Sequence, residues 1–297
     1  MLQITTEFKN KVIESLLEQR KNFTGTDTVF ARQWGINASV YNRLKNGERE
    51  GLIKDSQWLS LGREFGISMT ERKWNMARTD VFEVIQEDIL FCKAHSKAKI
   101  CVDECGIGKT YSAKYLSKTL QNCFYVDASQ AKSKQLFVRL IARTLGVEHR
   151  GKYADVKADI KYYLGVLPQP IIIIDEAGDL EHNAFLEIKE LWNATEGVCG
   201  WYLIGADGLR NKFEKGIANK KVGYKELFSR YSERYTSVVP SGSGEKLSFY
   251  RKLITDVLSV NMTDKSDLGV IVKRCLATDS GHIGGLRRAE SLLILNQ

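Results

Sequence analysis

The sequence predicts an α/β fold in which helices flank a parallel sheet. Short apolar segments alternate with helix-like ones along the middle of the chain, as in repeated strand–helix–strand units. One of them, Ile171–Ile174, has four β-branched residues without polar alternation, which is typical of a strand buried on both faces. Another, Ile100–Val102, precedes a glycine-containing loop and a helix-like segment that starts near Tyr111. These observations indicate a doubly covered sheet.

The loop Asp103–Thr110 ends in Gly-Lys-Thr between a strand and a helix, the layout of a phosphate-binding loop. Glycines let backbone N–H groups approach phosphate oxygens, and the helix N-terminus adds a partial positive charge. Lys109 would place a cation on the β and γ phosphates, and the Thr110 hydroxyl would ligate Mg²⁺. The residues expected to contact the nucleotide are Cys105, Gly106, Ile107, Gly108, Lys109, Thr110 and Tyr111.

Asp103 occupies the position where the phosphate-loop pattern has its first glycine. An acidic side chain near phosphates repels them unless it points away. A short aspartate side chain can instead close a local turn with a backbone N–H. The departure therefore bears on the turnover rate more than on nucleotide binding.

Asp175 and Glu176 follow the Ile171–Ile174 strand directly. Ligands bind at the carboxyl ends of strands in open α/β sheets, so this pair is placed where a nucleotide site is expected. Asp175 would ligate Mg²⁺, and Glu176 would act as the general base that orients the attacking water. The alternative is a core strand that ends in a solvated acidic turn. The phosphate loop favours the site, with ATP and Mg²⁺ as cofactors.

Further elements follow the same alternation. Expected strands are Cys123–Val126, Trp201–Ile204 and a short one at Ser237–Val239. Expected helices are Val81–Lys97, Lys134–Leu145, one that ends at Leu164, and one at Asn183–Asn193; the chain after Pro240-Ser241-Gly242-Ser243-Gly244 is expected to be helical to its end.

Residues 28–47 carry a helix-turn-helix pattern. Ala31 is small enough for two helices to cross closely, and Gly35 supplies a turn with positive φ. Asn46-Gly47 ends the second helix. We expect its outward face to meet DNA through Ser39, Asn42, Arg43 and Lys45. The alternative is a helical hairpin that only packs or binds protein.

The composition suits a soluble protein with a polyanionic partner. The 297 residues carry a formal net charge of +8, which favours nucleic acid or an anionic surface. Six scattered cysteines without a C-x-x-C pair favour a reducing compartment. Because no apolar run approaches about 18 residues, we expect no membrane span and a cytoplasmic location.

The order of these features, with Phe228-Ser229-Arg230-Tyr231 after the Trp201–Ile204 strand, resembles the AAA+ ATPases over about residues 95–235. A helix-turn-helix placed before such a core resembles the phage Mu transposition protein B family, which implies a bacterial or phage-infected cell. The resemblance implies a P-loop NTPase fold with four parts: a helix-turn-helix domain (1–66), a linker with a helix (67–97), an AAA+ α/β core (98–240) and a helical lid (241–297).

The resemblance also implies further catalytic residues. Arg230 would be an arginine finger that reaches a neighbouring subunit's γ-phosphate, with Arg234 as the alternative. Arg287, in Gly284-Gly285-Leu286-Arg287-Arg288, would be the second sensor. At the first sensor Ala206 lacks a hydrogen-bonding side chain, so either Asp207 takes that role or the sensor is absent.

The implied assembly is a ring or helical filament that holds duplex DNA along its inner surface. Cationic loops should line that surface and bind phosphates without sequence preference. The preferred residues are Lys132, Lys134, Arg150 and Lys152; a further basic cluster is Lys212, Lys215, Lys220, Lys221 and Lys225. The alternative for any of them is a solvated basic face.

The favoured function is therefore an ATPase, dependent on DNA and oligomerisation, that assembles on target DNA and activates a separate transposase. A replication initiator or helicase loader is the second enzymatic interpretation. A nucleotide-sensing transcriptional regulator, in which the helix-turn-helix selects an operator, is the third.

Overall fold

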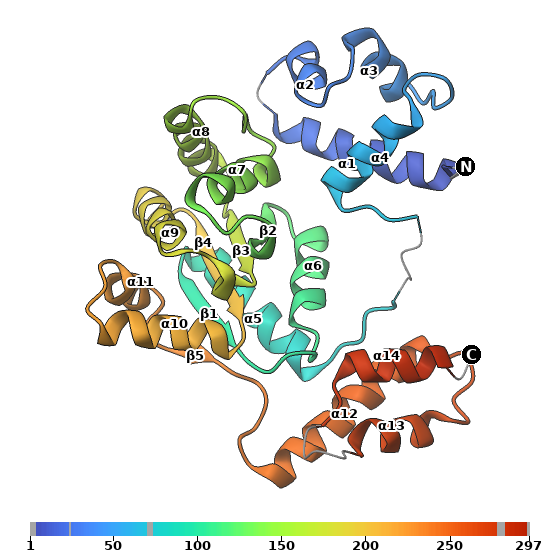
Figure 1. Cartoon of the computed structure of the whole chain (residues 1–297), viewed down its shortest axis with the longest axis vertical. Helices are drawn as coiled ribbons and strands as arrows, with labels where there is room; N and C mark the ends of the chain where they lie inside the picture. The colour runs from blue at the N-terminus through green and yellow to red at the C-terminus, as the bar shows by residue number, and fades with distance from the viewer. Residues whose placement is uncertain (1–3, 24, 70–73, 278–282, 296–297) are drawn as a thin grey trace.

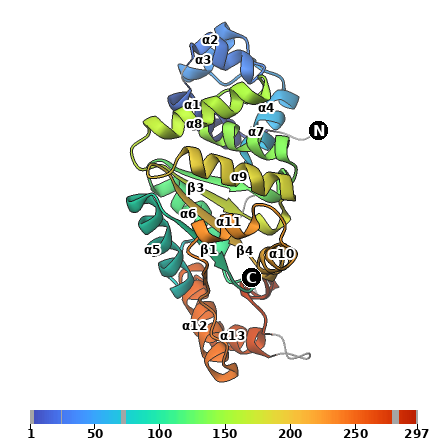
Figure 2. The same cartoon turned by 90° about the vertical axis from the view of Figure 1, so that its left-hand side faces the viewer.

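The computed structural model describes residues 4–23, 25–69, 74–277 and 283–295. A helical unit at the N-terminus, an α/β core and a C-terminal group of helices follow one another along the long axis of the molecule (Figures 1 and 2). The sequence ranges 1–66, 67–97 and 241–297 each include residues outside the described part.

Five parallel strands form one sheet in the order β2-β3-β4-β1-β5. Their bounds are β1 Ala98–Val102, β2 Cys123–Asp127, β3 Ile171–Asp175, β4 Gly200–Gly205 and β5 Tyr235–Thr236. The predicted α/β class with a parallel sheet is confirmed.

The prediction of a last strand at Ser237–Val239 is wrong. The strand lies at Tyr235–Thr236, where Thr236 pairs with Cys101 of β1. The N–H groups of Val238 and Val239 instead donate to the side chain of Asp103, which takes this segment out of the β ladder.

Side chains alternate between two apolar cores, one on each face of the sheet. Ile172 and Ile174 of β3 lie in the first core, whereas Ile171 and Ile173 lie in the second. Every residue of β3 is buried, which explains its uninterrupted apolar sequence.

Seven helices belong to the core region. Their bounds are α5 Asp80–His95, α6 Lys109–Thr119, α7 Lys134–Leu145, α8 Tyr153–Val166, α9 His182–Ala194, α10 Asp207–Ala218 and α11 Tyr224–Arg230. Helices α7 to α11 contribute to the first core, and α5 and α6 to the second. Helix α5 ends earlier than the predicted Lys97 because Ser96 adopts a left-handed conformation (φ 50°) and β1 starts at Ala98.

The N-terminal unit consists of four helices with an apolar core of its own. Their bounds are α1 Thr6–Asn22, α2 Asp27–Gln33, α3 Ala38–Lys45 and α4 Asp55–Phe65. Gly35 turns the chain between α2 and α3 at φ 69°. Phe30, Ala31 and Leu44 are buried where α2 and α3 meet α1, and Trp34 packs at the margin against Phe65, with ring centroids 4.8 Å apart.

The C-terminal helices are α12 Ser243–Asn261, α13 Leu268–Leu276 and α14 Leu286–Leu295. We call them the lid. Their buried side chains, including Ile254, belong to the same apolar core as α5 and α6. Among the helices of the described residues, none combines the length and the apolarity that crossing a bilayer requires.

Candidate nucleotide-binding site

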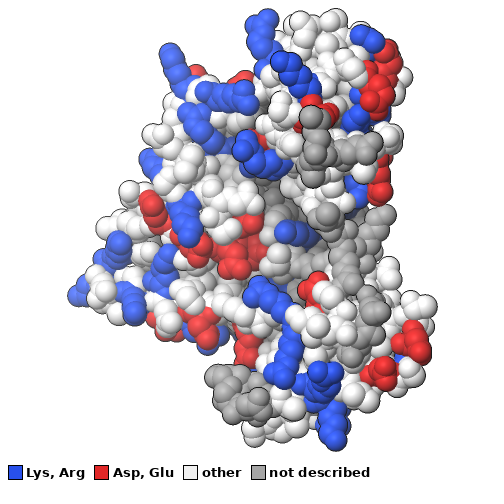
Figure 3. Space-filling view, turned by 45° about the vertical axis from the view of Figure 1, so that its right-hand side comes forward, with Lys and Arg blue, Asp and Glu red and all other residues white. Residues whose placement is uncertain are grey.

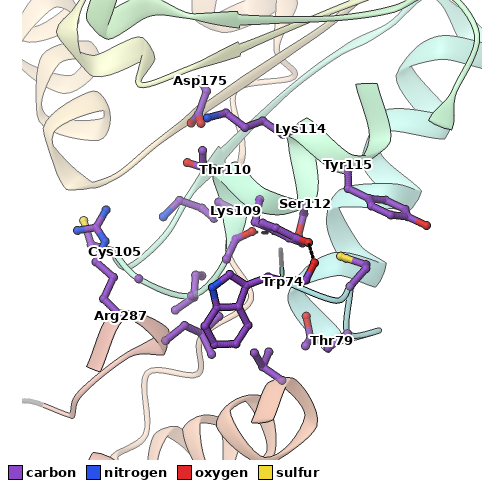
Figure 4. A pocket seen from close by; sticks show the side chains of 18 of the residues that line it. Trp74, Thr79, Cys105, Lys109, Thr110, Ser112, Lys114, Tyr115, Asp175 and Arg287 are labelled. Carbon is purple, nitrogen blue, oxygen red and sulfur yellow. Dashed lines mark hydrogen bonds between the residues drawn. The ribbon is translucent and has the colours of Figure 1, made fainter. Parts of the chain in front are cut away.

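A cavity of about 500 Å³ lies where the loops after β1, β3 and β4 meet the lid (Figure 4). The loop after β1 leads to α6 on one face of the sheet, whereas the loops after β3 and β4 lead to α9 and α10 on the other. Such a reversal is where open α/β sheets bind ligands. All seven phosphate-loop residues predicted to contact nucleotide, Cys105 to Tyr111, line this cavity.

Two glycines give the loop an unusual backbone conformation. Gly106 (φ 76°) and Gly108 (φ 99°) adopt left-handed backbone conformations that side chains disfavour. The Lys109 side chain is buried, and its Nζ donates to the main-chain oxygens of Asp103 (2.7 Å) and Glu104 (2.6 Å). The cation that would neutralise phosphate charge is therefore held at the loop by its own backbone.

The acidic pair faces this loop across the cavity. Asp175 is buried; its Oδ2 accepts from the Tyr125 hydroxyl at 2.9 Å and its Oδ1 from the Glu176 N–H at 2.9 Å. Burial next to Asp175 raises the pKa of Tyr125, so the hydroxyl stays protonated and donates. In Figure 4 the Lys114 side chain extends from α6 toward Asp175.

Glu176 is exposed and lines the same cavity. Partial burial, and then the negative charges of Asp175 and Asp179, raise its pKa. A raised pKa makes this carboxylate a better proton acceptor than an ordinary glutamate. Its position and its pKa both suit a general base.

The residues present fit Mg-ATP. Main-chain N–H groups at the start of α6 and the Lys109 ammonium suit a triphosphate, and the oxygens of Thr110 and Asp175 are ligands that Mg²⁺ prefers. The lining of the cavity thus combines anion-binding and cation-binding groups side by side.

The opposite end of the cavity is built by residues that the sequence patterns did not indicate. Trp74, Met76 and Thr79 precede or start α5 and line this end. The Trp74 indole N–H donates to Glu290 of the lid at 3.1 Å, and the Tyr111 hydroxyl donates to the Trp74 carbonyl at 2.6 Å. A tryptophan in a linker is a visible signal, but nothing local indicates that the linker folds back onto the phosphate loop.

Asp103 points away from the cavity. Its Oδ1 accepts from the N–H of Glu104 at 2.8 Å, which is the local turn considered from the sequence. Its Oδ2 accepts from Val238 and from Val239 (3.0 Å). The buried carboxylate is therefore surrounded by N–H donors and does not face the phosphate-binding backbone.

At the end of β4, Ala206 lines the cavity, whereas Asp207 is exposed at the start of α10 and outside the lining. Within the described lining, this strand end offers no hydrogen-bonding side chain at the position of a first sensor.

Two of the predicted arginines lie in different places. Arg287, exposed at the start of α14, lines the cavity, and Figure 4 shows its side chain reaching from the lid toward Cys105. Arg230 ends α11 outside the cavity of its own chain. Its guanidinium donates to Asn193 Oδ1 (2.9 Å) and to the Glu226 carbonyl (2.6 Å), and lies over the Trp192 ring.

The four core residues predicted to bind DNA differ in their pairing. Lys132 forms an ion pair with Asp179 and Lys134 one with Glu187, both at 2.9 Å. Arg150 and Lys152 are exposed and form no ion pair with the described residues. The latter two therefore carry charge that is available to a phosphate.

On α3, the four predicted DNA-binding residues are all exposed. Arg43 pairs with Glu48 at 2.6 Å and Lys45 with Asp27 at 3.1 Å, while Ser39 donates to the Asn37 side chain. Asn42 lies on the same outward face. Figure 3 shows basic side chains over the N-terminal end and over the lid, with a group of acidic side chains between them.

Residues 95–213 match the family described as an AAA domain, a segment that holds the phosphate loop and the acidic pair. Among curated proteins, none matches this chain. The ORC2 protein of Aeropyrum pernix, solved as ADPNP and ADP complexes, shares 17% sequence identity at a TM-score of 0.52, over 79% of this chain and 68% of that one. At that identity the likeness shows a common fold. NtrX from Brucella abortus, solved with ATP, shares 16% identity over 87% of this chain and 64% of its own, at a TM-score of 0.42.

Proposed function

We propose that the AAA domain at residues 95–213 makes this protein an ATPase that assembles on double-stranded DNA and directs a separate transposase. One observation supports nucleotide hydrolysis above all others: Lys109 and the Asp175–Glu176 pair face one cavity. A phosphate-binding cation, a metal-binding carboxylate and a base are the groups that phosphoryl transfer to water requires.

Each residue then has a role. Mg-ATP, when bound, would supply the phosphoanhydride bond to be cleaved and a metal charge that offsets the negative charge on the departing ADP. Lys109 would exchange its two carbonyl partners for phosphate oxygens, and Thr110 and Asp175 would hold the metal. Glu176 accepts the proton of the attacking water, helped by its raised pKa. Arg287, which lines the cavity from the lid, would contact the bound nucleotide and so link nucleotide binding to the position of the lid.

Assembly completes the site. Because Arg230 lies outside its own cavity, a neighbouring subunit is the partner whose γ-phosphate it would contact. To do so Arg230 must exchange its bonds to Asn193 and Glu226 for phosphate oxygens. Arg234, exposed just after α11, is the alternative finger. The resulting homo-oligomer would be a ring or a helical filament.

DNA would lie against the cationic residues of the core and of α3. Arg150 and Lys152 are the core residues best prepared for phosphate, because Lys132 and Lys134 must first give up carboxylate partners. On α3, Arg43 and Lys45 are also paired, and Ser39 and Asn42 offer polar groups for base edges or phosphates.

The second candidate is a replication initiator or helicase loader, which the fold shared with ORC2 also accommodates. The helix pair α2–α3 stands before the core, and this order favours the transposition role implied by the sequence resemblance. A nucleotide-sensing transcriptional regulator is the third candidate.

Electron microscopy on plain duplex DNA, with and without a non-hydrolysable ATP analogue, tests the proposal. We expect continuous filaments on DNA only with the analogue, and bare DNA with Lys109→Ala under both conditions. Discrete particles at one DNA site would support the regulator instead. Equal coating by Lys109→Ala and the parent would eliminate nucleotide-driven assembly.

A further inference from the structure

Two acidic side chains of the phosphate loop bond to the chain that enters the lid. The Asp103 carboxylate accepts from the N–H groups of Val238 and Val239, just after β5. The Glu104 carboxylate accepts from Lys246 Nζ and, at 2.7 Å, from the Tyr250 hydroxyl, both on α12. Neither Asp103 nor Glu104 lines the nucleotide cavity, so both side chains serve the lid rather than the ligand.

The main chain of the same two residues faces the opposite way. The carbonyl oxygens of Asp103 and Glu104 are the acceptors of Lys109 Nζ. The residue pair thus has its backbone on the lysine that would hold phosphate and its side chains on the lid. A movement of the Lys109 side chain would therefore act directly on the two residues that bond to the lid and to the segment leading into it.

The other end of the lid rests on the same loop. The Leu286 N–H donates to the Gly106 carbonyl at 2.8 Å, next to Arg287. A Cβ on Gly285 would lie 2.8 Å from that carbonyl oxygen, so only glycine permits this approach. The loop is therefore bonded both to the start of the lid and to the helix that carries Arg287.

The chemistry favours a fixed contact. Asp103 is buried, and its carboxylate accepts hydrogen bonds from three N–H groups. Breaking these bonds would leave a buried charge without partners, which costs free energy. For Glu104, burial raises the pKa, but the hydrogen bonds from Lys246 and Tyr250 outweigh burial and lower it overall, which keeps the carboxylate ionised at neutral pH.

We infer that Asp103 and Glu104 are positioning residues that hold the lid, and through it Arg287, against the phosphate loop, so that nucleotide binding and lid docking are coupled. The inference rests on the proposed nucleotide function. In this interpretation the aspartate at the glycine position of the loop is a built-in anchor for the lid. Because coupling is reciprocal, weaker anchoring lowers nucleotide affinity, and bound nucleotide strengthens the anchoring.

A double-mutant cycle tests whether the anchors act through Arg287. Binding of a non-hydrolysable ATP analogue with Mg²⁺ is measured by calorimetry for the parent, Asp103→Gly, Arg287→Ala and the double variant. We expect Asp103→Gly to weaken binding by about 5- to 50-fold in the parent and by less than about 2-fold beside Arg287→Ala. Equal losses in both backgrounds, or no loss in either, would overturn the inference.

Milder variants keep the test independent of folding. Asp103→Asn retains an acceptor oxygen and should recover much of the affinity, and Tyr250→Phe removes only the hydroxyl that donates to Glu104. Hydrogen exchange without nucleotide should rise in residues 238–250 for Asp103→Gly and Tyr250→Phe. The control Glu245→Gln, an exposed carboxylate at the start of α12, should match the parent.

The two measurements separate this inference from the proposed function. A parent chain that binds no analogue would overturn the nucleotide site and with it the coupling. A parent that binds the analogue, with unchanged exchange of residues 238–250 in Asp103→Gly and Tyr250→Phe, would overturn the anchoring alone.

Discussion

The lid and the N-terminal unit are both helical, yet they attach to the α/β core in opposite ways. The lid shares one apolar core with α5, α6 and the sheet, and it bonds to the phosphate loop. The N-terminal unit keeps its apolar core to itself. It meets the α/β core through a few polar pairs, Gln33 with His149 (2.7 Å) and Glu64 with Arg143 (2.5 Å), and the ring of Trp34 near His149.

This difference predicts different mobility. Separating the lid exposes apolar surface to water, which is costly, whereas separating the N-terminal unit mainly exchanges polar pairs for water. Relative motion of domains is the default where the interface is small and polar. We therefore expect the lid to stay packed on the core, where its docking depends on nucleotide, and the N-terminal unit to move independently of both.

The largest expected effect is confined to the core. Glu176→Gln should bind ATP like the parent but hydrolyse it about 10²- to 10⁴-fold more slowly, because it removes the carboxylate that we propose as the base for the attacking water. Steady-state turnover and analogue binding measure the two quantities. Glu196→Gln, another exposed carboxylate, is the matched control. Unchanged turnover in Glu176→Gln would remove Glu176 from the chemistry.

Two cavity-creating variants test whether the lid and the N-terminal unit differ in their attachment to the core. Ile254→Ala in the lid and Leu16→Ala in α1 each delete a fully buried side chain, at a cost of about 2–5 kcal/mol in the free energy of unfolding. Ile254→Ala should destabilise the lid and the sheet together, whereas Leu16→Ala should destabilise only α1–α4.

Hydrogen exchange during chemical denaturation locates each loss. If Leu16→Ala raised exchange in β1 and β3 as much as in α1, the N-terminal unit would not be energetically separate. If Ile254→Ala left β1 and β3 unchanged, the lid would be the separate part instead.

A smaller effect is expected at the interface. Arg143→Ala removes the ion pair between Arg143 and Glu64, two side chains that are 29% and 33% exposed. The free energy of unfolding should therefore fall by at most about 1 kcal/mol. Small-angle scattering should nevertheless detect a larger maximum dimension as the N-terminal unit moves. Lys161→Ala breaks an ion pair with Glu190 that joins two helices of the α/β core, so it should leave the maximum dimension unchanged.

The smallest expected effect is a shift in pH dependence. Asp179 is one of the negative charges that raise the pKa of Glu176, so Asp179→Asn should lower that pKa. Loss of turnover on the acidic side would then begin at a lower pH. Lys132→Met should have the opposite effect, because it leaves the Asp179 charge unpaired. A pH profile of kcat/KM that shifts the same way in both variants would contradict this origin of the shift.

Local sequence patterns predicted much of the fold. The β-branched segment Ile171–Ile174 is a fully buried strand, the glycines of the phosphate loop have the positive φ that they indicated, and most helices lie within a few residues of their predicted bounds. The sequence also indicated that Lys109 and Asp175 lie at one cavity, because the carboxyl ends of parallel strands share one edge of a sheet.

Patterns within short segments therefore predicted the α/β class and the loop and strand-end residues that line the cavity, since both depend on backbone preferences and local spacing. Tertiary structure alone decided where the last strand lies, that Trp74 lines the cavity, that Lys132 and Lys134 are paired, and that Asp103 bonds to Val238, 135 residues away. The physical reason is that hydrogen bonds and ion pairs form between whichever groups folding brings together, and no local pattern encodes a partner so distant along the chain.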